Sequence, residues 1–328
     1  MAKTVVVSGY GVRIRFRKGV FRVEKRDGVE EYNPVEIEQV IVATSGVSLT
    51  SKTIRKMIEY GIDLVFLDSR GYPIGRIYPP YINRTVDTRR AQYSSYGGDR
   101  AIHFIKEVVY AKISNQAGLV KRYYYYTRSD YLREDYEKLI GIREEVVGVS
   151  GDYSEVIEKL RSLEARAARI YWGSYALLLP RELGFEGRDQ DSMDPVNVSL
   201  NYGYGILYSE CWKALVLAGL DPYAGYMHVD RSGKPVLVFD FIEQFRFIVD
   251  YALLGMFRHK WRPEIVNGLL EYGSRTRIIE AINNFLDKQT SEINGSVVTL
   301  RQAIKRKAFE LASHLRGETL YTGFVWNW

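Results

Sequence analysis

The sequence contains very little cysteine and no long hydrophobic run, and each shortage excludes a class of protein. Cys211 is the single cysteine among 328 residues, so the chain has no intrachain disulfide and no zinc site built from cysteines. The longest strongly apolar stretches, residues 176–179 and 214–218, are far too short to span a membrane. The first residues lack the long apolar segment and cleavage site of a secretory signal. We therefore expect a cytoplasmic protein without membrane association.

An excess of charge of one sign is also missing. The chain has 46 basic and 40 acidic residues, which gives a formal net charge of +6. This balance permits a nucleic-acid partner but does not demand one. Charged residues make up 26% and hydrophobic residues 46% of the chain, which is typical of a folded globular protein. The length suits about two domains.

The first 79 residues show the alternation of a small β domain. Val12, Ile14 and Phe16 alternate with arginines, which predicts a half-buried strand. Asp27-Gly28 between two alternating runs favours a hairpin. Further strands are predicted at 36–42, 63–67 and 74–77, and a helix is predicted at 51–60. We expect a β-sandwich or split barrel with one short helix over residues 1–79.

The rest of the chain has mainly helical spacing. Residues 80–88 are predicted as a linker, and residues 89–328 as a larger, all-α domain. Asp194-Pro195 has the signature of a helix start, with aspartate as the N-cap and proline in the first turn. The predicted helices span about 99–113, 155–179, 195–219, 235–257, 263–272, 277–287 and 299–315. The expected fold class is therefore α+β and multidomain.

One carboxylate lies on the apolar face of a predicted helix. Leu160, Ala168 and Tyr171 share a face through spacings of three and four, and Glu164 lies on the same face. A buried, unpaired carboxylate is costly, so this position needs a cation or strong hydrogen bonds. A salt bridge to a neighbouring helix and a metal ion both meet that need.

A second polar group interrupts the apolar run at residues 236–249. Asp240, Glu243 and Gln244 are spaced i, i+3 and i+4, so they form a narrow polar stripe that faces solvent or a polar cleft. His228 precedes the turn into this helix. One imidazole and two carboxylates suit Mn²⁺ or Mg²⁺, and the nitrogen ligand favours Mn²⁺. Spacing alone does not distinguish such a ligand set from a structural histidine and solvated acids.

Several motifs, in order along the chain, resemble those of one family. They are the runs Leu163–Trp172, Asp194–Tyr204, Gly219–His228 and Phe239–Arg246, with the earlier runs Arg89–Tyr93 and Lys112–Gln116. Through them the chain resembles the CRISPR-associated adaptation integrases, the larger subunit of the spacer-acquisition complex. The similarity extends over nearly the whole chain, and linked motifs are more specific than any one of them.

The resemblance implies a metal-dependent DNA endonuclease and integrase whose helical domain is catalytic. By motif, the implied catalytic residues and ligands of Mn²⁺ or Mg²⁺ are Glu164, His228 and Glu243. Asp240 is implied as a supporting acid or an alternative ligand. In this family the 3′-hydroxyl of a foreign DNA fragment attacks a phosphodiester of the CRISPR array, which inserts the fragment as a spacer.

The resemblance also implies partners. We expect a homodimer joined through the β domains, a small partner subunit that bridges two dimers, and double-stranded DNA from the prespacer and the CRISPR repeat. Basic side chains of the helical domain would bind phosphates with little sequence preference and strong salt dependence. The predicted DNA contacts are Arg84, Arg89, Lys112, Arg166, Arg169, Arg246 and Arg258.

Two other functions fit the same residues. A branched-DNA repair nuclease without integration would use the same ligands, and substrates with and without a free 3′-hydroxyl would distinguish it from an integrase. A non-catalytic DNA-binding scaffold would pair its acids with Arg169 or Arg246. Such a scaffold would show no site-specific Mn²⁺ binding that Glu164→Ala removes.

Overall fold

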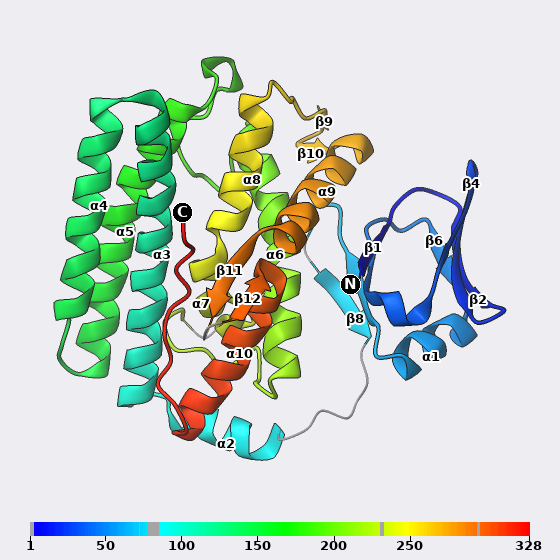
Figure 1. Cartoon of the computed structure of the whole chain (residues 1–328), viewed down its shortest axis with the longest axis horizontal. Coiled ribbons are helices and arrows are strands. Elements are labelled where there is room, and N and C mark those ends of the chain that lie inside the picture. Colours follow the sequence, from blue (N-terminus) through cyan, green and yellow to red (C-terminus); the bar gives the residue numbers. More distant parts are fainter. Residues whose placement is uncertain (1–2, 72, 78–84, 230–232, 294–295) are drawn as a thin grey trace.

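A computed structural model describes residues 3–71, 73–77, 85–229, 233–293 and 296–328. A strand-rich N-terminal domain stands beside a larger helical body (Figure 1). The expected fold class is therefore confirmed. Within the described ranges, no helix is long and apolar enough to cross a membrane.

The N-terminal domain consists of two four-stranded sheets. The first has the order β1 (Lys3–Val7), β5 (Ile37–Val42), β7 (Asp63–Leu67) and β8 (Pro73–Ile77). The second has the order β4 (Gly28–Tyr32), β3 (Val20–Lys25), β2 (Val12–Arg17) and β6 (Val47–Leu49). A 3₁₀ turn, η1 (Pro34–Glu36), precedes β5, and helix α1 (Ser51–Glu59) follows β6. The predicted hairpin, strands and helix are all present.

The first sheet separates two hydrophobic cores. Side chains alternate across a strand, so Val40 faces the second sheet, with Phe21, while Ile41 packs into the core of the helical body. A buried polar link joins the same sheet to the body, because Arg76 of β8 donates to the carbonyl oxygen of Ser209 at 2.9 Å. One face of the first sheet therefore packs against the second sheet, and its other face packs against the helical body.

The helical body surrounds one large core. Its helices are α2 (Thr85–Ser94), α3 (Asp99–Thr127), α4 (Asp130–Gly148), α5 (Tyr153–Leu178), α6 (Pro195–Leu217), α7 (Val236–Ile242), α8 (Phe247–Arg258), α9 (Tyr272–Lys288) and α10 (Leu300–Arg316), with 3₁₀ turns η2 (Arg181–Leu183) and η3 (Glu243–Phe245). Helices α3, α4 and α5 pack side by side (Figure 1). Helix α6 is buried along most of its length, which explains its nearly continuous apolar sequence.

The helix predicted at 263–272 is wrong. These residues include a hairpin of β9 (Ile265–Val266) and β10 (Leu269–Leu270). Asn267 and Gly268 both have positive φ, as a tight two-residue hairpin turn requires. A second hairpin pairs β11 (Thr290–Ile293) with β12 (Ser296–Thr299), so the body is not entirely helical.

The connection between the domains also differs from the prediction. Of the predicted linker at 80–88, residues 80–84 lie outside the described ranges and residues 85–88 belong to α2. The first long helix does not end near residue 113 but continues to Thr127, and α4 follows it without having been predicted.

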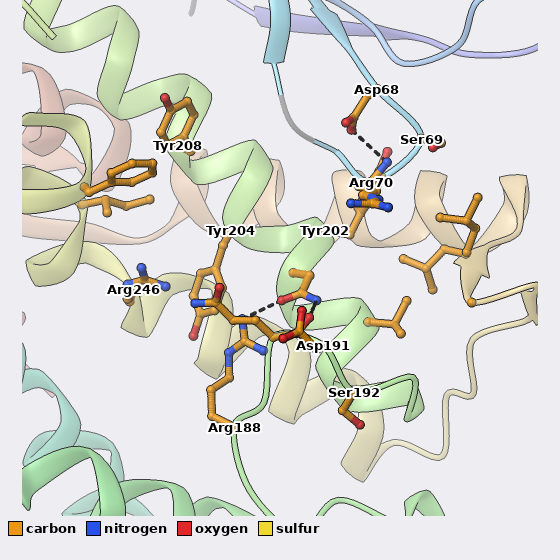
Figure 2. A pocket seen from close by; sticks show the side chains of 18 of the residues that line it. Asp68, Ser69, Arg70, Arg188, Asp191, Ser192, Tyr202, Tyr204, Tyr208 and Arg246 are labelled. Atoms are coloured by element: carbon orange, nitrogen blue, oxygen red, sulfur yellow. Dashed lines mark hydrogen bonds between the residues drawn. The ribbon is translucent and has the colours of Figure 1, made fainter. Parts of the chain in front are cut away.

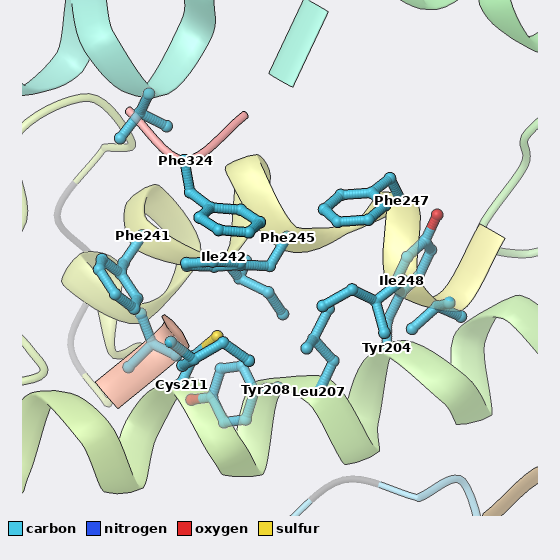
Figure 3. Packing of buried hydrophobic residues seen from close by; sticks show 14 of the residues in the cluster. Tyr204, Leu207, Tyr208, Cys211, Phe241, Ile242, Phe245, Phe247, Ile248 and Phe324 are labelled. Carbon is cyan, nitrogen blue, oxygen red and sulfur yellow. The ribbon is translucent and has the colours of Figure 1, made fainter. Parts of the chain in front are cut away.

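The helix predicted at 235–257 is interrupted at its centre by η3. Aromatic rings fill the space around this interruption: Phe241, Phe245 and Phe247 pack with Phe324 of the C-terminal segment above α6 (Figure 3). The interruption places Glu243 at the first position of a tight turn rather than in a continuous helix.

The C-terminal segment, residues 317–328, and the turn η3 are both hydrogen-bonded to Asn115 of α3. The side-chain amide of Asn115 donates to the carbonyl oxygens of Gln244 at 2.9 Å and Phe324 at 2.8 Å. In return, Oδ1 of Asn115 accepts the amide of Trp326 at 2.8 Å. Because all of these groups are buried, their hydrogen bonds fix the position of η3 relative to α3.

Candidate metal centre

Two predicted metal ligands meet around one lysine. Glu164 comes from the middle of α5 and Glu243 from η3, and Lys112 reaches both from α3. Its ammonium nitrogen lies 2.5 Å from Oε2 of Glu243 and also contacts Oε1 of Glu164. The carboxylate on the apolar face of α5 therefore has a cationic partner.

Opposite charges favour the charged forms of Lys112 and Glu243. Burial lowers the pKa of Lys112, but the charges of Glu164 and Glu243 outweigh it, and the net pKa lies above the ordinary value. Burial likewise raises the pKa of Glu243, yet Arg246 and Lys112 bring it below its usual range. Nε of Arg246 donates to Oε1 of Glu243 at 2.8 Å, and its guanidinium lies 4.5 Å from the ring centre of Tyr204.

Asp240 holds the loop that carries His228. Oδ2 accepts the backbone amides of Tyr226 at 2.6 Å and Met227 at 3.0 Å, and Oδ1 accepts the amide of His228 at 3.0 Å. The approach is close enough that a Cβ at Gly225 would lie 2.7 Å from Oδ2. This contact explains the glycine of the Gly-x-x-His motif, since any side chain there would push the loop off the carboxylate.

The same carboxylate orients the imidazole. Nδ1 of His228 lies 2.6 Å from Oδ1 of Asp240, an arrangement that, in the neutral ring, places the proton on Nδ1 and leaves the lone pair on Nε2. Burial lowers the pKa of His228, but the hydrogen bond and charge of Asp240 raise it, and the net pKa lies above the ordinary value. Both oxygens of Asp240 are thus engaged, which favours a supporting role over direct ligation.

The chemistry of the donor set suits a divalent cation. Across the described ranges, no three His, Cys, Asp or Glu side chains stand close enough together to form a metal site. The ammonium of Lys112 stands between the two carboxylates, whose charges also act on His228. Two carboxylates and an imidazole nitrogen match the preferences of Mn²⁺, and of Mg²⁺ less closely. Glu164, His228 and Glu243 would hold the ion.

His228 is among the residues that line a cleft of about 1150 Å³. Figure 2 shows part of this cleft, with Arg188, Tyr204 and Arg246 among its lining side chains. The helical body and the turn Asp68–Arg70 of the N-terminal domain both line it. Its basic and aromatic lining residues are Arg70, Arg161, Arg188, Lys234, Arg246, Tyr202, Tyr204, Tyr208 and Phe239. Cationic groups next to aromatic rings are the combination that binds phosphates and unpaired bases.

Arg188 in this cleft was missed by the sequence reasoning. Two asparagines of α6 hold its guanidinium: Nη1 donates to Asn197 at 2.9 Å and Nη2 to Asn201 at 2.6 Å. Its guanidinium also lies 5.5 Å from the ring centre of Tyr204. Asn197 and Asn201 in the run Asp194–Tyr204 were the available signal, but their partner lies in an irregular loop without periodicity.

Two of the predicted DNA contacts, Lys112 and Arg246, pair with the carboxylates Glu164 and Glu243. The described partners of these two cations are therefore acidic side chains of the centre. Their assignment as phosphate contacts stays a prediction.

The remaining predicted DNA contacts lie elsewhere. Arg84 is outside the described residues, and Arg89 and Arg169 are exposed. Arg166 is exposed on α5 and pairs with a glutamate of α4 at 2.8 Å. Arg258 lies over two tyrosine rings at the end of α3. These assignments also stay predictions.

Comparison with known proteins places the chain among relatives of its own length. It is 34% identical over 323 residues to "CRISPR-associated endonuclease Cas1 2" of Saccharolobus solfataricus, covering 98% of this chain and 97% of that protein. It is also 34% identical over 329 residues to "CRISPR-associated endonuclease Cas1" of Hyperthermus butylicus, covering 99% of both.

Solved structures share the fold at lower identity. A casposase bound to its integration product superposes with a TM-score of 0.81 at 23% identity, covering 98% of this chain and 92% of that one. A CAS1 protein from Thermotoga maritima gives 0.77 at 18% identity, covering 98% and 100%. The family model for "CRISPR associated protein Cas1" matches residues 5–284. The chain therefore belongs to the CRISPR associated protein Cas1 family.

Proposed function

We propose that this chain is a metal-dependent DNA endonuclease and integrase that inserts DNA fragments into a CRISPR array. The observation that carries the proposal is the hydrogen bond between Nδ1 of His228 and Asp240, which leaves Nε2 of the neutral ring as the atom that can bind a cation. The charges of Glu164 and Glu243 also act on this imidazole. Family membership adds support, because the relatives are named as endonucleases and a structural neighbour is a casposase bound to an integration product.

The residues of the centre have separate tasks. Asp240 keeps the proton of His228 on Nδ1, and Arg246 keeps Glu243 ionised and oriented. A divalent ion held by Glu164, His228 and Glu243 would act as a Lewis acid on the phosphodiester under attack. Joining exchanges one phosphodiester for another, so the reaction needs neither ATP nor a covalent bond to the protein.

The cleft beside His228 is the proposed path of the reacting DNA strand. Arg161 and Arg188 supply positive charge for phosphates, while Tyr204 and Tyr208 offer ring faces to unpaired bases. Contacts of this kind bind the backbone without selecting a sequence. The exposed arginines Arg89, Arg166 and Arg169 remain candidates for contacts with the flanking duplex.

The proposed assembly follows the structural neighbours. A Cas6-RT-Cas1–Cas2 complex superposes on 98% of this chain with a TM-score of 0.77, at 20% identity. We propose that this chain forms a homodimer through its β domains and binds a small partner subunit of the Cas2 kind. Residues 1–79 would serve this assembly, and residues 89–328 would carry the catalytic centre.

A strand-joining assay tests the proposed activity. A duplex with 3′-hydroxyl ends and a duplex with 3′-dideoxy ends are incubated with a CRISPR repeat, the protein and Mn²⁺. We expect joining only with the 3′-hydroxyl, and its loss in Glu164→Gln. The matched control is Glu145→Gln, which removes an exposed glutamate paired with Arg166.

Each other outcome favours a different function. Cutting of branched DNA without joining would identify a repair nuclease. DNA binding with neither cutting nor joining would identify a scaffold. Full joining activity in Glu164→Gln would remove that residue from the centre.

A further inference from the structure

We propose that Lys112 is a built-in competitor for the metal ion: its ammonium neutralises Glu164 and Glu243, and a bound divalent cation must displace it from between them. Lysine then sets the metal affinity of the centre. This inference rests on the proposed function, because it concerns the same carboxylates.

The contacts of Lys112 differ from those of other lysines in the body. Its side chain is 12% exposed and contacts one carboxylate from α5 and one from η3. Lys106, on the same helix, donates to the backbone carbonyls of Val147 and Val149 instead. Within the described part of the chain, Lys112 is the lysine that pairs with two carboxylates.

Charge balance explains why a lysine is useful at this point. Glu164 and Glu243 carry two negative charges, and Lys112 and Arg246 carry two positive charges, so the four groups are neutral together. Without Lys112, the buried carboxylate of Glu243 and the half-buried carboxylate of Glu164 would face each other with too little positive charge nearby. The lysine therefore compensates both negative charges at once, from one position between the two carboxylates.

The position of the ammonium makes competition unavoidable. It faces Oε2 of Glu243, a buried oxygen on the side of the carboxylate opposite the bond from Arg246 to Oε1. A divalent cation that binds Oε1 of Glu164 and Oε2 of Glu243 together would take the place of the ammonium. Two cations at one place repel each other strongly where solvent is excluded, so ion and ammonium do not share the position.

Calorimetric titration of Mn²⁺ into the full-length protein tests this inference. Lys112→Met keeps the length of the side chain and removes its charge, and we expect it to bind Mn²⁺ about tenfold more tightly, or better. Lys106→Met is the matched control, since it removes a lysine of the same helix whose described hydrogen bonds go to backbone carbonyls. We expect its Mn²⁺ affinity to equal that of the wild type.

A thermal unfolding measurement in EDTA supplies a second readout. We expect a lower unfolding temperature for Lys112→Met, because Glu164 and Glu243 lose their shared cation, and a larger upward shift on adding Mn²⁺ than for the wild type. If Lys112→Met does not fold in EDTA, the double variant Lys112→Met/Glu164→Gln replaces it. That variant removes both charges, and we expect it to fold.

The outcomes separate this inference from the proposed function. If Lys112→Met binds Mn²⁺ no more tightly than the wild type, while Glu164→Gln loses Mn²⁺ binding, the proposed competition is wrong and the ligand set still holds. Mn²⁺ binding that survives Glu164→Gln overturns the ligand set of the proposed function. A double variant as unstable as Lys112→Met would show that the two charges do not compensate each other, which also overturns the inference.

Discussion

Asp240→Asn is expected to damage both the stability of the fold and the metal centre. Each oxygen of Asp240 accepts two hydrogen bonds, so replacing either oxygen with the amide nitrogen of asparagine breaks the two bonds that this oxygen accepts. A hydrogen bond to a charged group contributes about 1.5–3 kcal/mol, so losing two of them costs about 3–6 kcal/mol. An imidazole that accepts from the new amide through Nδ1 carries its proton on Nε2 and loses its ligand lone pair.

The measurement is denaturant unfolding in EDTA together with calorimetric titration of Mn²⁺. We expect Asp240→Asn to lose about 3–6 kcal/mol of unfolding free energy and most of its Mn²⁺ affinity. Asp221→Asn is the control, because each oxygen of Asp221 accepts one described hydrogen bond, from the amide of Tyr223 and the hydroxyl of Tyr93. Wild-type stability in Asp240→Asn with lost Mn²⁺ binding would instead identify Asp240 as a direct ligand. Wild-type values for both would refute the reasoning.

Three further predictions follow from buried or cleft residues. Asn115→Ala removes three buried hydrogen bonds and should lower the unfolding free energy by about 3 kcal/mol or more in denaturant titration. Burial raises the pKa of Asp250 to about 6, so its stabilising contribution is lost as pH rises from about 4 to 6. Asparagine at position 250 does not titrate. The free energy of unfolding of Asp250→Asn, relative to that of the wild type, should therefore rise by about 3 kcal/mol from pH 4 to pH 7 in unfolding experiments. Arg188→Ala should weaken the binding of all DNA sequences alike and should lower the number of salt ions released on DNA binding by about one. Arg143→Ala, a change at a half-buried arginine of α4 that pairs with Glu144, should alter neither quantity.

Periodicity located the unusual carboxylate but not its partner. Glu164 was identified because helical spacing is a local property, readable within one segment. Lys112, which neutralises it, lies 52 residues earlier on another helix, and no local pattern connects the two. The role of Asp240 was equally out of reach, since it depends on a loop folding back onto the helix that follows it.

Breaks in regular structure were predicted unevenly. The turn η3 contains neither proline nor glycine, so the sequence gives no reason to interrupt the helix at Glu243. Tertiary hydrogen bonds from Asn115 and the C-terminal segment stabilise it instead. The hairpin at Asn267-Gly268 did carry a local signal, which the apolar spacing of its neighbours outweighed in the prediction.

The most direct test of the central claim is to locate Mn²⁺ by anomalous scattering in crystals of the full chain. We expect one ion within coordination distance of Glu164, of Nε2 of His228 and of Glu243, with the Lys112 ammonium withdrawn from between the carboxylates. Lys112 still bridging Glu164 and Glu243, with Mn²⁺ bound elsewhere or not at all, would contradict it.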